Sequence, residues 1–129
     1  KLSMKSSLAE INEKSLYLKF INFLLMSKSN FEDEYEIQTN TVDKIFEGIS
    51  LQKTLLKIDV EGFEINVVKG SRKKLKEIPF ILLENQFGNH FKNNDFKDVI
   101  RFLSEQKFMI CKKFLFPTLH YQDVLFKKI

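Results

Sequence analysis

The sequence predicts an α/β domain built around a mostly parallel sheet, and three observations support this fold class. Apolar, β-favouring stretches alternate along the chain with stretches whose apolar residues recur every three or four positions. Residues 80–83 are apolar without interruption, as in a central parallel strand that helices cover on both faces. Residues 55–64 change from a strand pattern to a helix pattern at Gly62. Strands that alternate with helices imply a parallel sheet with right-handed crossovers.

Three elements are expected before the central motif. Residues 12–27 place apolar side chains three and four positions apart, which predicts an amphipathic helix. Residues 35–39 alternate between polar and apolar side chains and predict a strand. Residues 41–46 predict a short helix that ends at Gly48 and is capped by one of two polar residues, Asn40 or Thr41.

The remainder of the chain predicts further alternation of strands and helices. In order, the expected elements are a strand at 55–60, a helix at 63–76, a strand at 80–83 that ends in Glu84 and Asn85, a helix at 93–106, and strands at 107–116 and 123–128. Gly70 is expected to mark a break or a close packing point in the first helix. The final two strands are close enough in sequence to form an antiparallel pair.

Length, charge and cysteine content indicate which kinds of partner and cellular compartment to expect. With 129 residues and 43% apolar residues, the chain is one domain or part of one. Its net charge of +4 is scattered, so it lacks the concentrated patch that nucleic-acid binding needs, and no nucleic-acid partner is expected. The single Cys111 excludes an intrachain disulfide and fits a reducing, cytoplasmic compartment. No apolar run is long enough to predict a transmembrane span.

Residues 55–64, which read L-L-K-I-D-V-E-G-F-E, resemble the signature of the FkbM family of S-adenosylmethionine (SAM)-dependent methyltransferases. The resemblance extends from about Ser6 to the C-terminus. Other segments resemble further parts of the family pattern in the same order and spacing, at 41–45 (T-V-D-K-I), 67–71 (V-V-K-G-S), 79–84 (P-F-I-L-L-E), 102–103 with 107–108, and 123–126 (D-V-L-F).

The family resemblance implies a Rossmann-like, class I methyltransferase fold of which the N-terminal half is missing. Class I enzymes hold SAM with a glycine-rich turn after the first strand and an acidic residue at the end of the second. The four glycines of this chain are too far apart to form that turn: Gly48, Gly62, Gly70 and Gly88. Residues 1–129 are therefore expected to form the C-terminal half of the domain. The chain also begins with Lys, so we expect a piece of a longer protein.

The candidate catalytic residues follow the predicted strands. Asp59 is placed where an open α/β sheet keeps its ligands, beyond the carboxyl end of a strand. We expect it to lie beside the SAM methyl group or the substrate hydroxyl, although a cap on the following helix would also explain it. The other predicted catalytic residues are Glu61, Glu84 and His90, and the predicted cofactor-binding residues are Asp59 and Gly62. Glu64 is expected to favour the start of its helix electrostatically.

A metal site is a further expectation. Asp59 and Glu84 end adjacent predicted strands and, with Asn85, resemble in placement the Mg²⁺ ligands of catechol-type class I O-methyltransferases. Carboxylate and amide oxygens suit Mg²⁺. The resemblance thus implies Mg²⁺ as a second cofactor beside SAM.

The resemblance implies a SAM-dependent O-methyltransferase that acts on a hydroxyl of a sugar or other secondary metabolite, so the expected partner is a small-molecule or saccharide substrate. The alternative from another class is a non-catalytic α/β interaction module with a basic, Phe-rich face. In either case, an apolar edge left exposed by a missing half-sheet would favour self-association.

Overall fold

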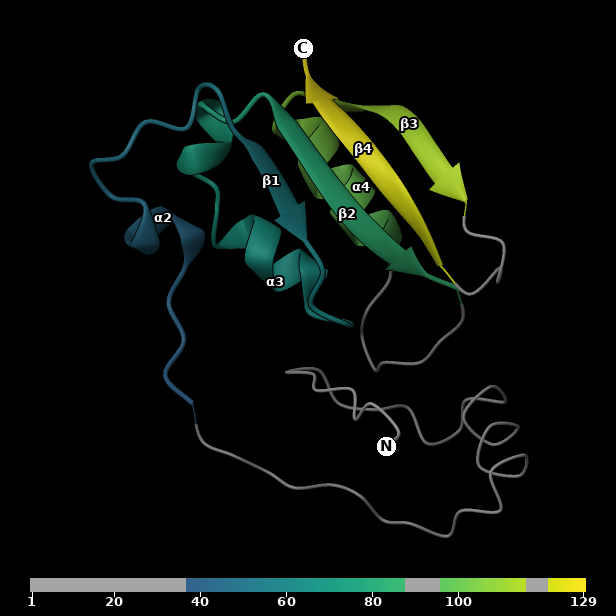
Figure 1. Cartoon of the computed structure of the whole chain (residues 1–129), viewed down its shortest axis with the longest axis horizontal. Coiled ribbons are helices and arrows are strands. Elements are labelled where there is room, and N and C mark those ends of the chain that lie inside the picture. The colour runs from purple at the N-terminus through teal and green to yellow at the C-terminus, as the bar shows by residue number, and fades with distance from the viewer. Residues whose placement is uncertain (1–36, 88–95, 116–120) are drawn as a thin grey trace, which may run out of the picture.

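A computed structural model describes residues 37–87, 96–115 and 121–129 of the chain and shows a mixed α/β fold (Figure 1). Its elements, in order, are α2 (Val42–Ile45), β1 (Leu55–Ile58), α3 (Glu64–Lys69), the 3-10 helix η1 (Lys74–Lys76), β2 (Phe80–Gln86), α4 (Phe96–Glu105), β3 (Phe108–Leu115) and β4 (Tyr121–Lys128). The predicted helix at 12–27, the first two residues of the strand at 35–39, and His90 lie outside the described residues. Residues 37–39, the described part of the predicted strand at 35–39, form no strand.

The predicted mostly parallel sheet is wrong for the described residues. The four strands lie in the order β1-β2-β4-β3, and only β1 and β2 are parallel. β4 runs antiparallel to both of its neighbours. The pairing of the last two strands was predicted, but the insertion of β4 between β2 and β3 was not. β4 buries Val124 and Phe126, whereas most of β3 is exposed, as expected for a central strand beside an edge strand.

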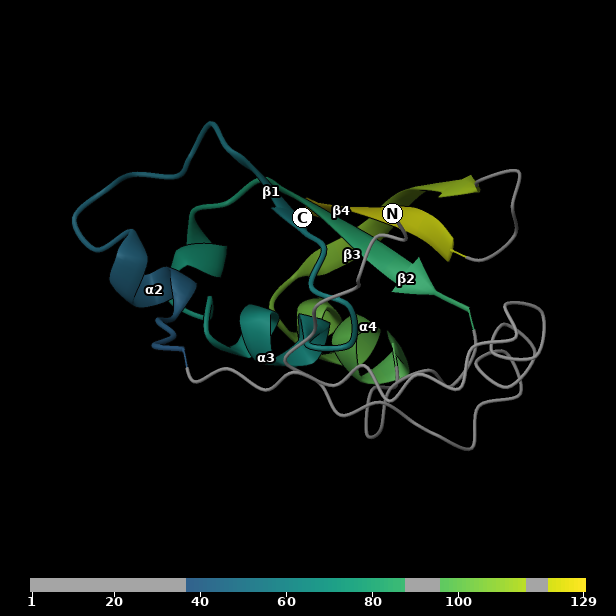
Figure 2. The same ribbon diagram turned by 60° about the horizontal axis from the view of Figure 1, so that its bottom comes forward.

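Helices cover one face of this sheet. α3 and α4 pack beside each other behind the strands in Figure 1, and the rotated view in Figure 2 shows both on the same side. The core consists of apolar residues from every strand, from α3, η1 and α4, and from two connecting segments: Leu51, Ile58, Val68, Leu75, Ile78, Ile81, Leu83, Val99, Leu103, Phe108, Val124 and Phe126. Among the described elements, none covers the opposite face, which we call the open face.

Strand alternation divides the side chains of the sheet between these two faces. Ile58 and Leu83 are register partners, and both are buried in the core. The preceding pair, Lys57 and Leu82, therefore points to the open face. β1 ends at Ile58, two residues earlier than predicted, so Asp59 begins the loop that follows the strand.

The predicted helix at 63–76 is divided into α3 and η1, as the expectation of a break at Gly70 anticipated. A Cβ atom at Gly70 would lie 3.2 Å from Thr41 Cγ2 and 3.3 Å from the Asn66 carbonyl oxygen, so glycine permits close contact with the start of α2. Thr41 caps α2 by accepting a hydrogen bond from the Lys44 amide at 3.2 Å. The Asp43 carboxylate accepts hydrogen bonds from two backbone amides at the start of η1, at 2.9 Å from the Lys73 amide and 2.8 Å from the Lys74 amide.

Candidate functional site

The loop from β1 to α3 has an unusual backbone conformation. Two successive residues, Glu61 and Gly62, have positive φ angles of 42° and 96°. Glycine adopts such angles freely, but for a residue with a side chain the left-handed region costs about 1–2 kcal/mol. Strained residues of this kind persist where the surrounding structure imposes them, and they gather at functional sites. This loop is therefore the first candidate for a functional site.

Glu64 is the first residue of α3 and is only 4% exposed. Its Oε1 atom accepts a hydrogen bond from the Gly62 amide at 3.0 Å. The N-cap residue Phe63 makes no side-chain capping bond, so Glu64 supplies the side-chain acceptor at this helix start. Glu64, for which an electrostatic role at the helix N-terminus is predicted, also makes a direct contact with the loop.

Lys57 lies within electrostatic reach of three carboxylates, those of Asp59, Glu84 and Asp123. Its Nζ atom donates a hydrogen bond to Asp59 Oδ2 at 2.9 Å. This hydrogen bond and the negative charge of Asp59 raise the pKa of Lys57 above its ordinary value, and the charges of Asp123 and Glu84 act in the same direction. The carboxylates of Asp59 and Glu84 therefore both lie within electrostatic reach of one lysine on the open face.

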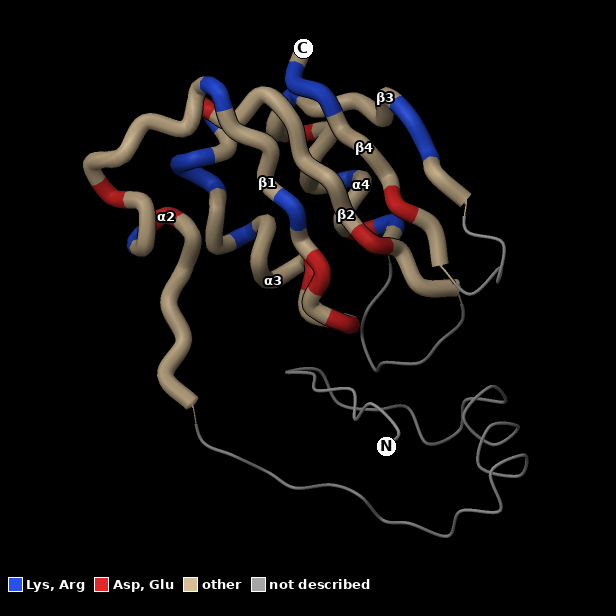
Figure 3. The backbone as a smooth tube through the Cα atoms, viewed as in Figure 1, with Lys and Arg blue, Asp and Glu red and all other residues tan. Residues whose placement is uncertain are grey.

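Asp123 is a further acidic residue near Glu84 that the sequence analysis did not select as a candidate. It is the register partner of Glu84 across β2 and β4, so both carboxylates share the open face. Within the described part of the chain, its Oδ1 atom is buried and has no hydrogen-bond partner. Figure 3 shows acidic segments in red where β1 and β2 end and β4 begins. Asp123 lies beside Glu84 because β4 pairs with β2, and local sequence patterns do not encode that pairing.

The predicted Mg²⁺ ligand set does not fit the structure. Glu84 and Asn85 are consecutive residues of a regular strand, so their side chains point to opposite faces of the sheet. Asn85 follows the alternation of Ile81 and Leu83 onto the helix-covered face, away from Asp59. In the described ranges, no group of three or more His, Cys, Asp or Glu residues is arranged to hold a metal ion. We therefore derive no step of the chemistry from Mg²⁺.

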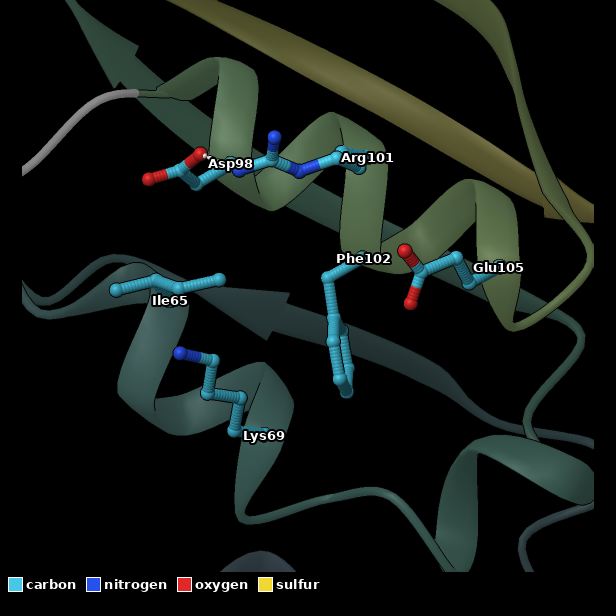
Figure 4. A pocket seen from close by; sticks show the side chains of 6 residues that line it. All are labelled: Ile65, Lys69, Asp98, Arg101, Phe102 and Glu105. Atoms are coloured by element: carbon cyan, nitrogen blue, oxygen red, sulfur yellow. Dashed lines mark hydrogen bonds and ion pairs between the residues drawn. The ribbon is translucent and has the colours of Figure 1, made fainter.

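A small pocket lies elsewhere, between α3 and α4 on the helix-covered side (Figure 4). It has a volume of about 150 Å³ and contains the ion pair of Arg101 with Asp98. Its lining residues are Ile65, Lys69, Asp98, Arg101, Phe102 and Glu105. None of the predicted site residues lines this pocket, so it is separate from the acidic loop and strand ends.

Comparison with known families identifies the family of this chain. The family model described as the methyltransferase FkbM domain matches residues 4–110, which includes β1, the strained loop, β2 and α4. The chain belongs to the FkbM methyltransferase family. The resemblance of residues 55–64 to the family signature is thereby confirmed. In this chain, residues 55–64 form β1 and the loop that carries Asp59, Glu61 and Gly62.

One curated protein to which this chain is similar is the hexuronic acid methyltransferase AglP of Haloferax volcanii. It is 35% identical over 81 residues, which is 62% of this chain and 32% of AglP. The match thus spans about a third of the length of that relative. No solved structure gives a significant match to this chain. Among the described helices, none is long and apolar enough to cross a membrane.

Proposed function

We propose that residues 1–129 form the C-terminal part of a SAM-dependent O-methyltransferase whose acceptor is a saccharide. The supporting observation is the place of Asp59, which directly follows β1 at the end of the sheet where Glu84 and Asp123 also lie. Open α/β sheets bind ligands at the carboxyl ends of their parallel strands, and β1 and β2 are the parallel pair here. Membership of the FkbM family provides the reaction class.

The chemistry that this end of the sheet can perform follows from its charge. SAM, when bound, supplies an electrophilic methyl group on a positively charged sulfur. A group of carboxylates favours that positive charge, because opposite charges attract more strongly in a partly desolvated site than in water. We assign Asp59 and Gly62 to the neighbourhood of the cofactor. The glycine-rich turn that the family uses is not present in this sequence, so these residues contribute only part of the binding.

Asp59 is the proposed base. Lys57 holds its Oδ2 atom, so Oδ1 is the oxygen that can accept the proton of an acceptor hydroxyl. With SAM bound, methyl transfer would join the hydroxyl oxygen to the methyl carbon and break the carbon–sulfur bond, whose electron pair would stay on sulfur. Asp59 would accept the hydroxyl proton. Glu61 and Glu84 are proposed to accept hydrogen bonds from neighbouring sugar hydroxyls, and we retain His90 as a candidate acceptor contact.

A sugar acid is the acceptor class that we put forward first, because the relative AglP is named a hexuronic acid methyltransferase. The test uses the full-length protein with SAM that carries a radioactive methyl group. Oligosaccharides that contain a hexuronic acid are compared with otherwise identical ones that contain the neutral hexose. We expect label in the saccharide fraction, with more label in the uronic-acid series.

Transfer to neither series, under conditions in which the protein is folded, would contradict the proposed saccharide acceptor. Labelling of the neutral series alone would retain the methyl transfer but reject the sugar acid. Retention of SAM binding without transfer to any acceptor would favour the interaction-module alternative.

A further inference from the structure

The buried carboxylate of Glu64 has a function that its position at a helix start does not by itself explain. We propose that Glu64 is a positioning residue, which holds the β1–α3 loop in its strained conformation and so aims Asp59 and Glu61 at the reacting atoms. This inference rests on the proposed methyl-transfer function, because it concerns the same site.

The β1–α3 loop has a conformation that costs free energy. Glu61 has a φ of 42° and Gly62 a φ of 96°, and both residues lie in the turn from the end of β1 into α3. A left-handed residue with a side chain returns to a relaxed conformation unless its neighbours prevent it. Something in the structure must therefore hold this turn.

The contact between Glu64 and Gly62 can hold this turn. Glu64 Oε1 accepts a hydrogen bond from the Gly62 amide at 3.0 Å, and the glutamate is 4% exposed. A buried carboxylate that accepts a backbone hydrogen bond makes a strong, directional contact. The bond joins the amide between the two left-handed residues to the first residue of a packed helix, and so it fixes the turn relative to α3.

Asp59 and Glu61 are the residues that move if this contact is lost. Asp59 precedes Gly62 by three positions and Glu61 directly precedes it, within the same short loop. Glu64 itself is buried, whereas Asp59 is exposed at the open face. Glu64 therefore acts on the site through the backbone, and a small displacement of a reacting group is enough to slow a reaction substantially.

Two substitutions separate this role from a purely electrostatic one. Glu64→Gln keeps an oxygen at the same reach but removes the charge, whereas Glu64→Asp keeps the charge but withdraws the oxygen by one methylene group. If the hydrogen bond to Gly62 is what matters, Gln replaces Glu and Asp does not. If the charge near the helix N-terminus is what matters, the order is reversed.

The experiment measures two quantities in the full-length protein: the exchange rate of the Gly62 amide hydrogen by NMR, and kcat for methyl transfer. For Glu64→Asp we expect faster exchange at Gly62 and a kcat lower by about tenfold or more. For Glu64→Gln we expect both quantities to remain within about threefold of wild type, since the acceptor is kept. The matched controls are Glu105→Asp and Glu105→Gln, at an exposed glutamate that ends α4.

Three results would overturn the proposal: an active Asp variant with an inactive Gln variant, equal loss in both, or wild-type behaviour in both. A wild-type protein that transfers no methyl group would instead count against the proposed function. The exchange rate of the Gly62 amide would still show, in that case, whether Glu64 holds the loop.

Discussion

At the residue scale, the site depends on one lysine among carboxylates. Lys57 donates a hydrogen bond to Asp59, and the charges of Glu84 and Asp123 reach it as well. The side chains of Lys57 and Asp59 are 53% and 41% exposed in the described part of the chain, so solvent screens their attraction. The contact therefore contributes little to the stability of the fold, and its larger effect is expected in the orientation of Asp59.

Replacing Lys57 separates these two effects. We expect Lys57→Gln to change the free energy of unfolding by less than about 1 kcal/mol, because the ion pair is exposed. The same change is expected to lower kcat for methyl transfer by about tenfold, because Asp59 loses the group that fixes its Oδ2 atom. Urea denaturation and steady-state kinetics on the full-length protein measure the two quantities. Equal kcat values for wild type and variant would remove Lys57 from the site.

At the element scale, α2 and the segment after α3 support each other. Asp43 accepts hydrogen bonds from the amides of Lys73 and Lys74, and its own amide donates to the Gly70 carbonyl oxygen at 3.1 Å. Thr41 lies against Gly70 at the same junction. Two segments that resemble the family pattern, at 41–45 and 67–71, are thus in direct contact. Their residues hold the helix that follows the site loop against the rest of the fold.

Removing the Asp43 carboxylate tests this junction. Asp43→Ala leaves two backbone amides without their acceptor, and hydrogen bonds to a charged group contribute about 1.5–3 kcal/mol. We expect the free energy of unfolding to fall by about 2 kcal/mol in urea denaturation. Asp98→Ala is the control, because its ion pair with Arg101 is exposed on α4 and is expected to contribute less than about 1 kcal/mol. A loss no larger than that of the control would show that Asp43 does not secure the junction.

Glu77 connects the loop before β1 to η1 and makes this region sensitive to acid. Its carboxylate accepts hydrogen bonds from the Leu51 amide at 3.0 Å and from Lys74 Nζ at 3.2 Å. The hydrogen bond from Leu51, followed by that from Lys74, lowers the pKa of Glu77 below its ordinary value of 4.5. A group whose pKa is lowered by folding stabilises the fold above its unfolded pKa, and this contribution is lost as the pH falls through the lowered value.

The lowered pKa of Glu77 predicts how stability changes with pH. The wild-type protein should lose stability between about pH 6 and pH 3, and Glu77→Gln should lose less over the same interval. Urea denaturation midpoints at both pH values measure the difference. Parallel losses in wild type and variant would show that Glu77 does not contribute to the acid sensitivity.

The sequence anticipated what depends on local pattern and missed what depends on distant pairing. The apolar run at 80–83 and the change of period at Gly62 predicted β2 and the β1–α3 loop, and the candidate Asp59 was found because it follows the strand. The position of β4 depends on contacts between residues about 40 positions apart, as between Glu84 and Asp123. For this reason the mostly parallel sheet was wrong, and the placement of Glu84 beside Asp123 and of Asn85 on the opposite face was not anticipated.

At the scale of the whole molecule, helices cover one face of the described sheet and the other face is open. Leu55, Phe80 and Met109 lie in one row across the strands of the open face, and Leu55 and Met109 are each 53% exposed. The acidic strand ends lie at the margin of this face. We propose that SAM is held partly by residues beyond this stretch of 129, because the sequence contains no glycine-rich turn.

The isolated 129-residue chain should accordingly bind SAM weakly or not at all. We expect calorimetric titration to show no binding tighter than about 1 mM, which corresponds to about 4 kcal/mol of binding free energy. The folded state of the sample is verified by circular dichroism before the titration. Submillimolar binding would show that the cofactor site lies within the 129 residues.

The measurement that tests the central claim most directly is the effect of Asp59→Asn on methyl transfer by the full-length protein. Asparagine keeps the size of the side chain but cannot accept the proton, so we expect kcat to fall by about 100-fold or more, with wild-type folding and SAM binding. Asp98→Asn, at an exposed position on α4, serves as the control and should keep full activity. An Asp59→Asn protein as active as that control would contradict the assignment of methyl transfer to the end of β1.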